Sequence, residues 1–202
     1  MRLPFLPSFF PSFLPSFLPS FLPFLLFHFT PDLFPPPTAH VTLDPDTANS
    51  WLILSEDRRR VTWGEKWQDL PDNPERFNLY PFVLGQEEFT GGRHFFEVLV
   101  KNEEEWLVGV ARKSVQRKFI FPYGSDGGVW EVGKLGSEPS FLTLGEEPKR
   151  VRVTLNYEGG RVAFYNADSA ALILEYPPAS FSGETLLPLF YVYGKTQLEL
   201  FP

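Results

Sequence analysis

The sequence predicts an all-β fold, an antiparallel β-sandwich, for residues 39–202. Short apolar runs in this region are separated by turn-forming residues, and no window of a dozen residues shows convincing helical periodicity. Within residues 150–155 apolar and polar side chains alternate strictly, so the three apolar side chains should face a core and the two arginines should face water. Roughly 165 residues are enough to bury most of the surface of the unfolded chain.

The strands are expected in order between turn-forming residues. The first hairpin joins residues 51–54 to residues 61–63, and we interpret its tip, the Arg-Arg-Arg at residues 58–60, as a turn rather than a basic binding patch. Alternation indicates later strands at residues 94–100 and 196–200. Turn formers punctuate the chain at Asp72-Asn73-Pro74, Gly91-Gly92, Asp126-Gly127-Gly128, Glu158-Gly159-Gly160 and Pro177-Pro178.

Large aromatic side chains are expected to supply much of the core. Each such ring can bury roughly 150–250 Å², which is a large share for a domain of this size. The residues expected in the core are Trp51, Trp63, Phe96, Trp106, Trp130, Phe164 and Phe190.

Residues 1–38 differ in composition and are not expected to form a domain. Residues 1–37 contain ten of the 22 Phe and ten of the 21 Pro, and from Pro7 to Pro23 proline recurs at every fourth position. This spacing prevents an α-helix. We therefore expect an extended or disordered low-complexity segment rather than a membrane span or a signal peptide. A CCTT nucleotide repeat read in frame encodes Pro-Ser-Phe-Leu, so we also hypothesise that this segment is translated intron.

Charge and cysteine content exclude several function classes. The net charge of -7 belongs entirely to residues 38–202, which opposes a nucleic-acid partner. With no Cys there can be no disulfide and no RING-type zinc site. The three histidines lack metal-ligand spacing, and the acidic clusters at residues 87–88, 103–105 and 146–147 lie at predicted turns, where solvated charge is the simpler interpretation. We expect no metal, no cofactor and no catalysis.

Six sequence blocks occur in an order that points to one family. They are VTLDPDTANSWLILSEDRRRV at 41–61, LPDNPERF at 70–77, FTGGRHFFEV at 89–98, WLVGVAR at 106–112, LNYEGGRVAFYNA at 155–167 and PLFYVYG at 188–194. In this order they resemble the PRY-SPRY domain of tripartite-motif proteins and butyrophilins. The chain departs from the usual pattern at Phe95-Phe96, where Tyr-Trp is common, at Asn156, where Asp is common, and in a shorter loop between Trp130 and Val151.

The resemblance implies a bent antiparallel sandwich of the concanavalin-like jelly-roll type, with a PRY part at residues 39–90 and a SPRY part at residues 91–202 in one structural domain. It also implies a cytoplasmic, monomeric module that binds a protein or a short peptide and does not itself enter a membrane. Such a module would be the substrate-recognition domain of a tripartite-motif ubiquitin ligase involved in innate immune regulation. The alternative is the cytosolic domain of a butyrophilin-like immune receptor that senses a small ligand or a partner protein.

Relatives bind ligands through three segments, which the resemblance transfers to residues 80–82, 119–123 and 191–193. Loops on a rigid sandwich often carry binding residues, and aromatic anchors dominate interface energies. The predicted partner-binding residues are Tyr80, Phe82, Phe119, Phe121, Tyr123, Tyr191 and Tyr193. Four of them are expected to line one shallow pocket: Phe82, Phe121, Tyr123 and Tyr191.

Overall fold

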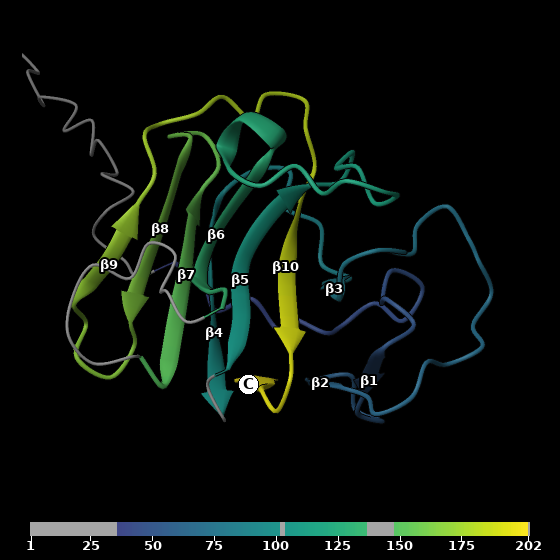
Figure 1. Cartoon of the computed structure of the whole chain (residues 1–202). Helices are drawn as coiled ribbons and strands as arrows, with labels where there is room; N and C mark the ends of the chain where they lie inside the picture. Colours follow the sequence, from purple (N-terminus) through teal and green to yellow (C-terminus); the bar gives the residue numbers. More distant parts are fainter. Residues whose placement is uncertain (1–35, 102–103, 137–147, 202) are drawn as a thin grey trace, which may run out of the picture. The chain divides into compact units, whose positions relative to one another are not determined.

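The computed structural model describes residues 36–101, 104–136 and 148–201. In these ranges eleven strands form two antiparallel sheets, and the only helix is a single 3-10 turn, Ser125–Gly127 (Figure 1). The predicted all-β sandwich is therefore confirmed. Parts of three sequence predictions lie outside the described residues: the tail up to residue 35, Glu103, and loop residues 137–147 with Glu146 and Glu147.

The two sheets differ in size. The larger sheet has the strand order β1 (Leu52–Leu54), β2 (Arg60–Trp63), β11 (Gln197–Leu200), β4 (Arg93–Lys101), β7 (Arg150–Asn156), β8 (Arg161–Asn166) and β9 (Leu172–Glu175). The smaller sheet has the order β3 (Phe82–Leu84), β10 (Leu186–Tyr193), β5 (Glu105–Arg112) and β6 (Val129–Lys134). In the smaller sheet β5 and β10 pair along their whole lengths, so they form its centre.

The core lies between the inner faces of these sheets. Five of the seven aromatic residues predicted for it are at most 2 % exposed: Phe96, Trp106, Trp130, Phe164 and Phe190. For Trp51 and Trp63 the prediction overestimated burial, because both side chains are only half-buried. Their rings stack on each other, 5.0 Å apart, at the β1 edge of the larger sheet, where no further strand covers them within the described part of the chain.

Strict alternation produces β7 as predicted, with Val151, Val153 and Leu155 buried. The two arginines of this strand lie on the opposite face but are half-buried rather than fully solvated. Both pair with Glu97 of β4: Arg152 Nη2 lies 2.6 Å from Glu97 Oε1, and Arg150 Nη1 lies 3.4 Å from Glu97 Oε2. A shared carboxylate therefore ties the outer face of β7 to β4.

The predicted first hairpin is also present, with residues 55–59 joining β1 to β2. Ser55 Oγ accepts a hydrogen bond from the Arg60 backbone N–H at 2.9 Å, which closes the turn. Arg58 adopts a left-handed backbone conformation, with a φ of 55°. The arginine tip is thus a tight turn held by its own backbone.

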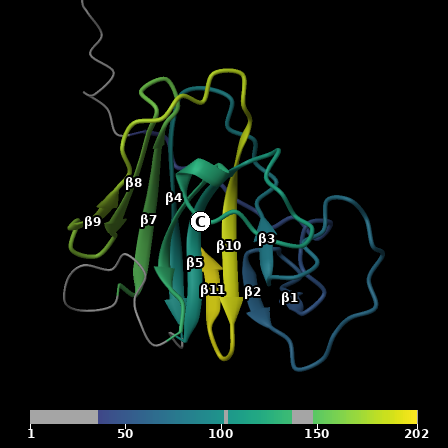
Figure 2. The ribbon, with the colours of Figure 1, turned by 45° about the horizontal axis from the view of Figure 1, so that its top comes forward.

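A second apolar cluster covers the outer face of the smaller sheet. Its buried members are Phe77, Phe82, Leu84, Leu107, Ala111, Val115, Phe121, Val129, Leu187, Leu189 and Tyr191. Most come from the four strands, but Phe77 comes from the segment before β3, and Val115 and Phe121 come from the loop at residues 113–128. Figure 2 shows this loop extending from the end of β5 toward β10 and β3. Segments far apart in the sequence therefore meet on this face.

Candidate partner-binding site

Strand register places one row of side chains across the outer face of the smaller sheet. Phe82 of β3 is opposite Tyr191 of β10, Tyr191 is opposite Leu107 of β5, and Leu107 is opposite Gly133 of β6. Successive side chains of a strand point to opposite faces, so this row faces away from the core between the sheets. It forms the floor on which the 113–128 loop lies.

The loop adds two rings to this floor. Phe121 stacks on Phe82, with ring centroids 3.9 Å apart, and Tyr123 meets Phe121 edge-on at 5.0 Å. Tyr191 lies 5.0 Å from Phe82, and Tyr80 lies 6.0 Å from Tyr123. The three segments singled out in the sequence are therefore brought together through five of the seven candidate residues.

Burial separates these rings into two roles. Phe82, Phe121 and Tyr191 are 0 %, 4 % and 7 % exposed, whereas Tyr123 is 42 % exposed and Tyr80 is half-buried. A ring without accessible surface cannot contact a partner directly. The buried three therefore support Tyr123 and hold it in place, while Tyr123 and Tyr80 present surface to solvent.

The tip of the same loop projects further into solvent. Phe119 and Ile120 are 73 % and 77 % exposed. Phe119 has a φ of 67°, a conformation that side-chain-bearing residues rarely adopt. Its backbone N–H donates a hydrogen bond to Asn78 Oδ1 at 2.9 Å, beside Leu79, which is 57 % exposed. The tip is thus an apolar projection fixed to the segment before β3.

Tyr193 belongs to a different aromatic group. Its ring contacts Trp63 at 4.8 Å, and Trp63 in turn stacks on Trp51. Tyr193 is 46 % exposed. Tyr193 therefore groups with Trp51 and Trp63, two residues that the sequence predicts for the core, and not with the Tyr123 cluster.

Two carboxylates beside the rings were missed in the sequence. Glu105 Oε2 accepts a hydrogen bond from the Tyr191 hydroxyl at 3.1 Å. Burial, together with this neighbouring carboxylate, raises the pKa of Tyr191. Glu131 is only 3 % exposed; its Oε1 accepts a hydrogen bond from the Gly124 N–H at 3.2 Å, and its Oε2 has no partner among residues 36–101, 104–136 and 148–201. Burial raises the pKa of Glu131 to about 7.

Sequence signals for these carboxylates existed but were ambiguous. Glu105 belongs to the acidic cluster at 103–105, for which the sequence predicts a solvated turn. In the structure it is the first residue of β5 and is half-buried. Glu131 stands alone among apolar residues in Val129–Val132, a position that would have suggested a buried charge.

Burial, with smaller contributions from Tyr80 and from these two carboxylates, raises the pKa of Tyr123 to about 12.

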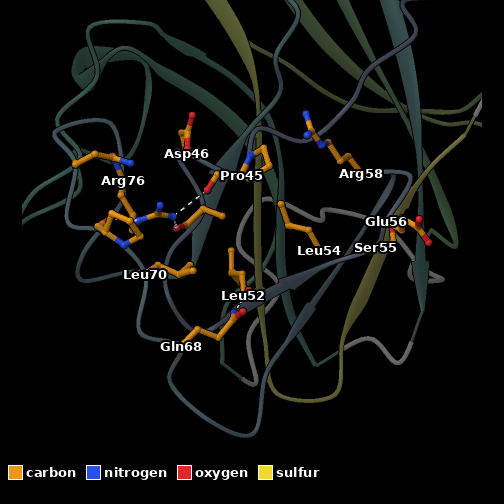
Figure 3. A pocket seen from close by; sticks show the side chains of 13 residues that line it. Pro45, Asp46, Leu52, Leu54, Ser55, Glu56, Arg58, Gln68, Leu70 and Arg76 are labelled. Carbon is orange, nitrogen blue, oxygen red and sulfur yellow. Dashed lines mark hydrogen bonds between the residues drawn. The ribbon is translucent and has the colours of Figure 1, made fainter.

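A separate pocket of about 460 Å³ lies beside the first hairpin (Figure 3). Its lining includes Leu52, Leu54, Leu70 and the exposed Arg58. Arg76 is 6 % exposed and donates to three backbone carbonyls, those of Pro71 at 2.9 Å, Pro45 at 2.8 Å and Ala48 at 2.6 Å. Arg76 therefore fixes the walls of the pocket, and Arg58 is the exposed cation of its lining.

In the described residues no helix is long and apolar enough to cross a membrane, and no group of three or more His, Asp or Glu side chains is arranged to hold a metal ion.

Comparison with known proteins identifies the family. Residues 41–89 match PRY, the SPRY-associated domain, and residues 93–201 match the SPRY domain. The chain belongs to the PRY-SPRY family of tripartite-motif proteins and butyrophilins.

Several curated proteins are similar to the chain in sequence. The chain is 48 % identical over 155 residues to the E3 ubiquitin-protein ligase TRIM11 of Rattus norvegicus, covering 74 % of this chain and 33 % of that protein. It is 43 % identical over 169 residues to butyrophilin subfamily 1 member A1 of Mus musculus, covering 79 % of this chain and 32 % of that protein. The chain thus spans about a third of the length of these curated relatives.

A solved structure supports the fold. The crystal structure of the TRIM65 PSpry domain matches with a TM-score of 0.67 at 20 % sequence identity, covering 82 % of this chain and 90 % of that one. At this identity the likeness shows the PRY-SPRY fold alone.

Proposed function

We propose that this PRY-SPRY domain recognises a protein or a short peptide through the outer face of its four-stranded sheet. The observation that carries the proposal is the convergence of three segments, distant in sequence, on one aromatic cluster with Tyr123 exposed at its surface. Exposed aromatic rings on a rigid support provide a large contact area with little side-chain entropy to lose. The proposed contact and support residues are Tyr80, Phe82, Phe119, Phe121, Tyr123, Tyr191 and Tyr193.

In a longer protein, this domain would select the substrate of a tripartite-motif ubiquitin ligase that acts in innate immune regulation in the cytoplasm. The similarity to TRIM11 supports this role, because the family match accounts for a third of such a ligase and leaves the ligase chemistry to the remainder. The second candidate, the cytosolic domain of a butyrophilin-like receptor, is supported by the match to butyrophilin subfamily 1 member A1.

The binding face is tested by comparing two variants of the full chain on a peptide array. Tyr123→Ala removes the most exposed ring of the cluster, whereas Arg58→Ala removes the exposed cation that lines the separate pocket. We expect Tyr123→Ala to lose binding to the peptides that the unmodified chain retains, and Arg58→Ala to keep it. The opposite pattern would move the binding site to the pocket of Figure 3.

A further inference from the structure

The two carboxylates lie on the same face of the sheet as the aromatic cluster. Glu105 and Leu107 are two residues apart on β5, so their side chains leave the same face. Glu131 of β6 is opposite Gly109 of β5, and Gly109 is again two residues beyond Leu107. Glu105 and Glu131 therefore flank the row formed by Phe82, Tyr191 and Leu107 from its two sides.

Neither side chain is paired with a cation within the described residues. Among the described residues, Glu105 has the Tyr191 hydroxyl as its partner and Glu131 has the Gly124 N–H, and neither forms an ion pair. The buried Glu131 Oε2 has no hydrogen-bond partner in the part of the chain that the structure describes. A buried, unpartnered carboxylate oxygen is costly, and a cation brought close to it would lower that cost.

The cations of the 113–128 loop form hydrogen bonds away from the aromatic cluster. Arg117 donates to the carbonyls of Lys113 at 2.8 Å and Glu75 at 3.2 Å, and Lys118 Nζ donates to Asp72 Oδ1 and the Asn73 carbonyl, each at 2.7 Å. These bonds hold both positive charges against the segment that precedes β3. The cluster therefore presents aromatic rings and negative charge, with its nearest loop cations already engaged.

We propose that this face selects partner segments carrying an arginine or a lysine, whose cation lies against Tyr123 and Tyr80 within reach of the field of Glu105 and Glu131. The inference rests on the proposed function and names the chemistry of its partner. A tyrosine ring face attracts a cation, and a carboxylate behind the ring adds to that attraction. A phosphorylated or otherwise anionic ligand would meet the same carboxylates and be repelled.

The test uses the full chain and three pools of short peptides with acetylated and amidated ends and randomised flanks. The central residue is fixed as Arg in one pool, Gln in the second and Glu in the third. Binding is measured by fluorescence polarisation. We expect the Arg pool to bind about tenfold more tightly than the Gln pool, a difference of about 1.4 kcal/mol. This preference should shrink as the salt concentration rises.

Two matched variants locate the charge. Glu105→Gln keeps an oxygen that can accept from the Tyr191 hydroxyl and removes only the negative charge, so it should abolish much of the Arg preference. Glu175→Gln removes one negative charge from β9 of the other sheet, where it pairs with Arg161, and should leave the preference unchanged.

The outcomes separate the two proposals. Equal binding of all three pools, lost in Tyr123→Ala, would overturn the cation preference and leave the binding face in place. A preference for the Glu pool, or an Arg preference that Glu105→Gln does not reduce, would also overturn it. Absence of binding by every pool would overturn both this inference and peptide recognition by the domain.

Discussion

The buried carboxyl of Glu131 makes the stability of this domain depend on pH in a way that one substitution should remove. Glu131 is 3 % exposed, and burial raises its pKa from 4.5 to about 7. In the unfolded chain the same carboxyl is solvated and ionises near its ordinary pKa. Between these two values the folded state holds a proton that the unfolded state has lost, so unfolding becomes easier as the pH rises.

The size of the effect follows from the two pKa values. Each unit of pKa corresponds to about 1.4 kcal/mol, so the rise from 4.5 to about 7 is worth about 3–4 kcal/mol over the whole pH range. The full stability is present below pH 4.5, declines as the pH rises, and levels off above pH 7. Glu131→Gln cannot ionise, and it retains an oxygen to accept from the Gly124 N–H.

The assay is urea unfolding followed by tryptophan fluorescence, at pH 5 and at pH 8. The free energy of unfolding of Glu131→Gln minus that of the unmodified chain should increase by up to about 3 kcal/mol from pH 5 to pH 8. The reason is that only the unmodified chain must bury a charge at pH 8. All other titrating groups are common to both proteins and cancel in the difference. A difference that stays constant from pH 5 to pH 8 would refute the reasoning.

Three further outcomes are expected. Trp106→Ala should lower the free energy of unfolding by about 3–5 kcal/mol, because the ring is 0 % exposed; a melting temperature within a degree or two of the unmodified chain would contradict its place in the core. Arg76→Ala should cost at least about 2 kcal/mol in urea unfolding, since three carbonyls lose a charged donor, and Arg58→Ala should cost little. Metal analysis of the purified chain should find no stoichiometric zinc, and the chain alone should transfer no ubiquitin.

The sequence was sufficient for the sheet and much of the core because alternation and ring size are local properties. Val151, Val153 and Leu155 are buried as the pattern of β7 requires, and Trp106 and Trp130 lie between the sheets. Trp51 and Trp63 could not be placed from composition, because their burial depends on whether another strand covers the β1 edge.

The candidate site was predictable only in part. The resemblance to the PRY-SPRY family predicts that the segments of Tyr80, Phe121 and Tyr191 lie together. Which rings are exposed and which are buried depends on how the 113–128 loop lies on β3 and β10. Glu131 is buried and accepts a hydrogen bond from Gly124 of that loop, a contact between segments that local pattern does not encode. Tyr193 points to Trp63 because of the path of β10 beside the first hairpin, which also lies beyond local pattern.

The conformation of Phe119 places stability and recognition in opposition. A phenylalanine with a φ of 67° strains the free protein, and glycine would adopt the same backbone at lower cost. Glycine would also remove the most exposed ring of the loop. A library at this position sorted for thermal resistance should therefore enrich glycine, and the same library sorted for partner capture should retain an aromatic residue. The residue that related domains carry at this position would show whether the loop has been under selection to bind a partner.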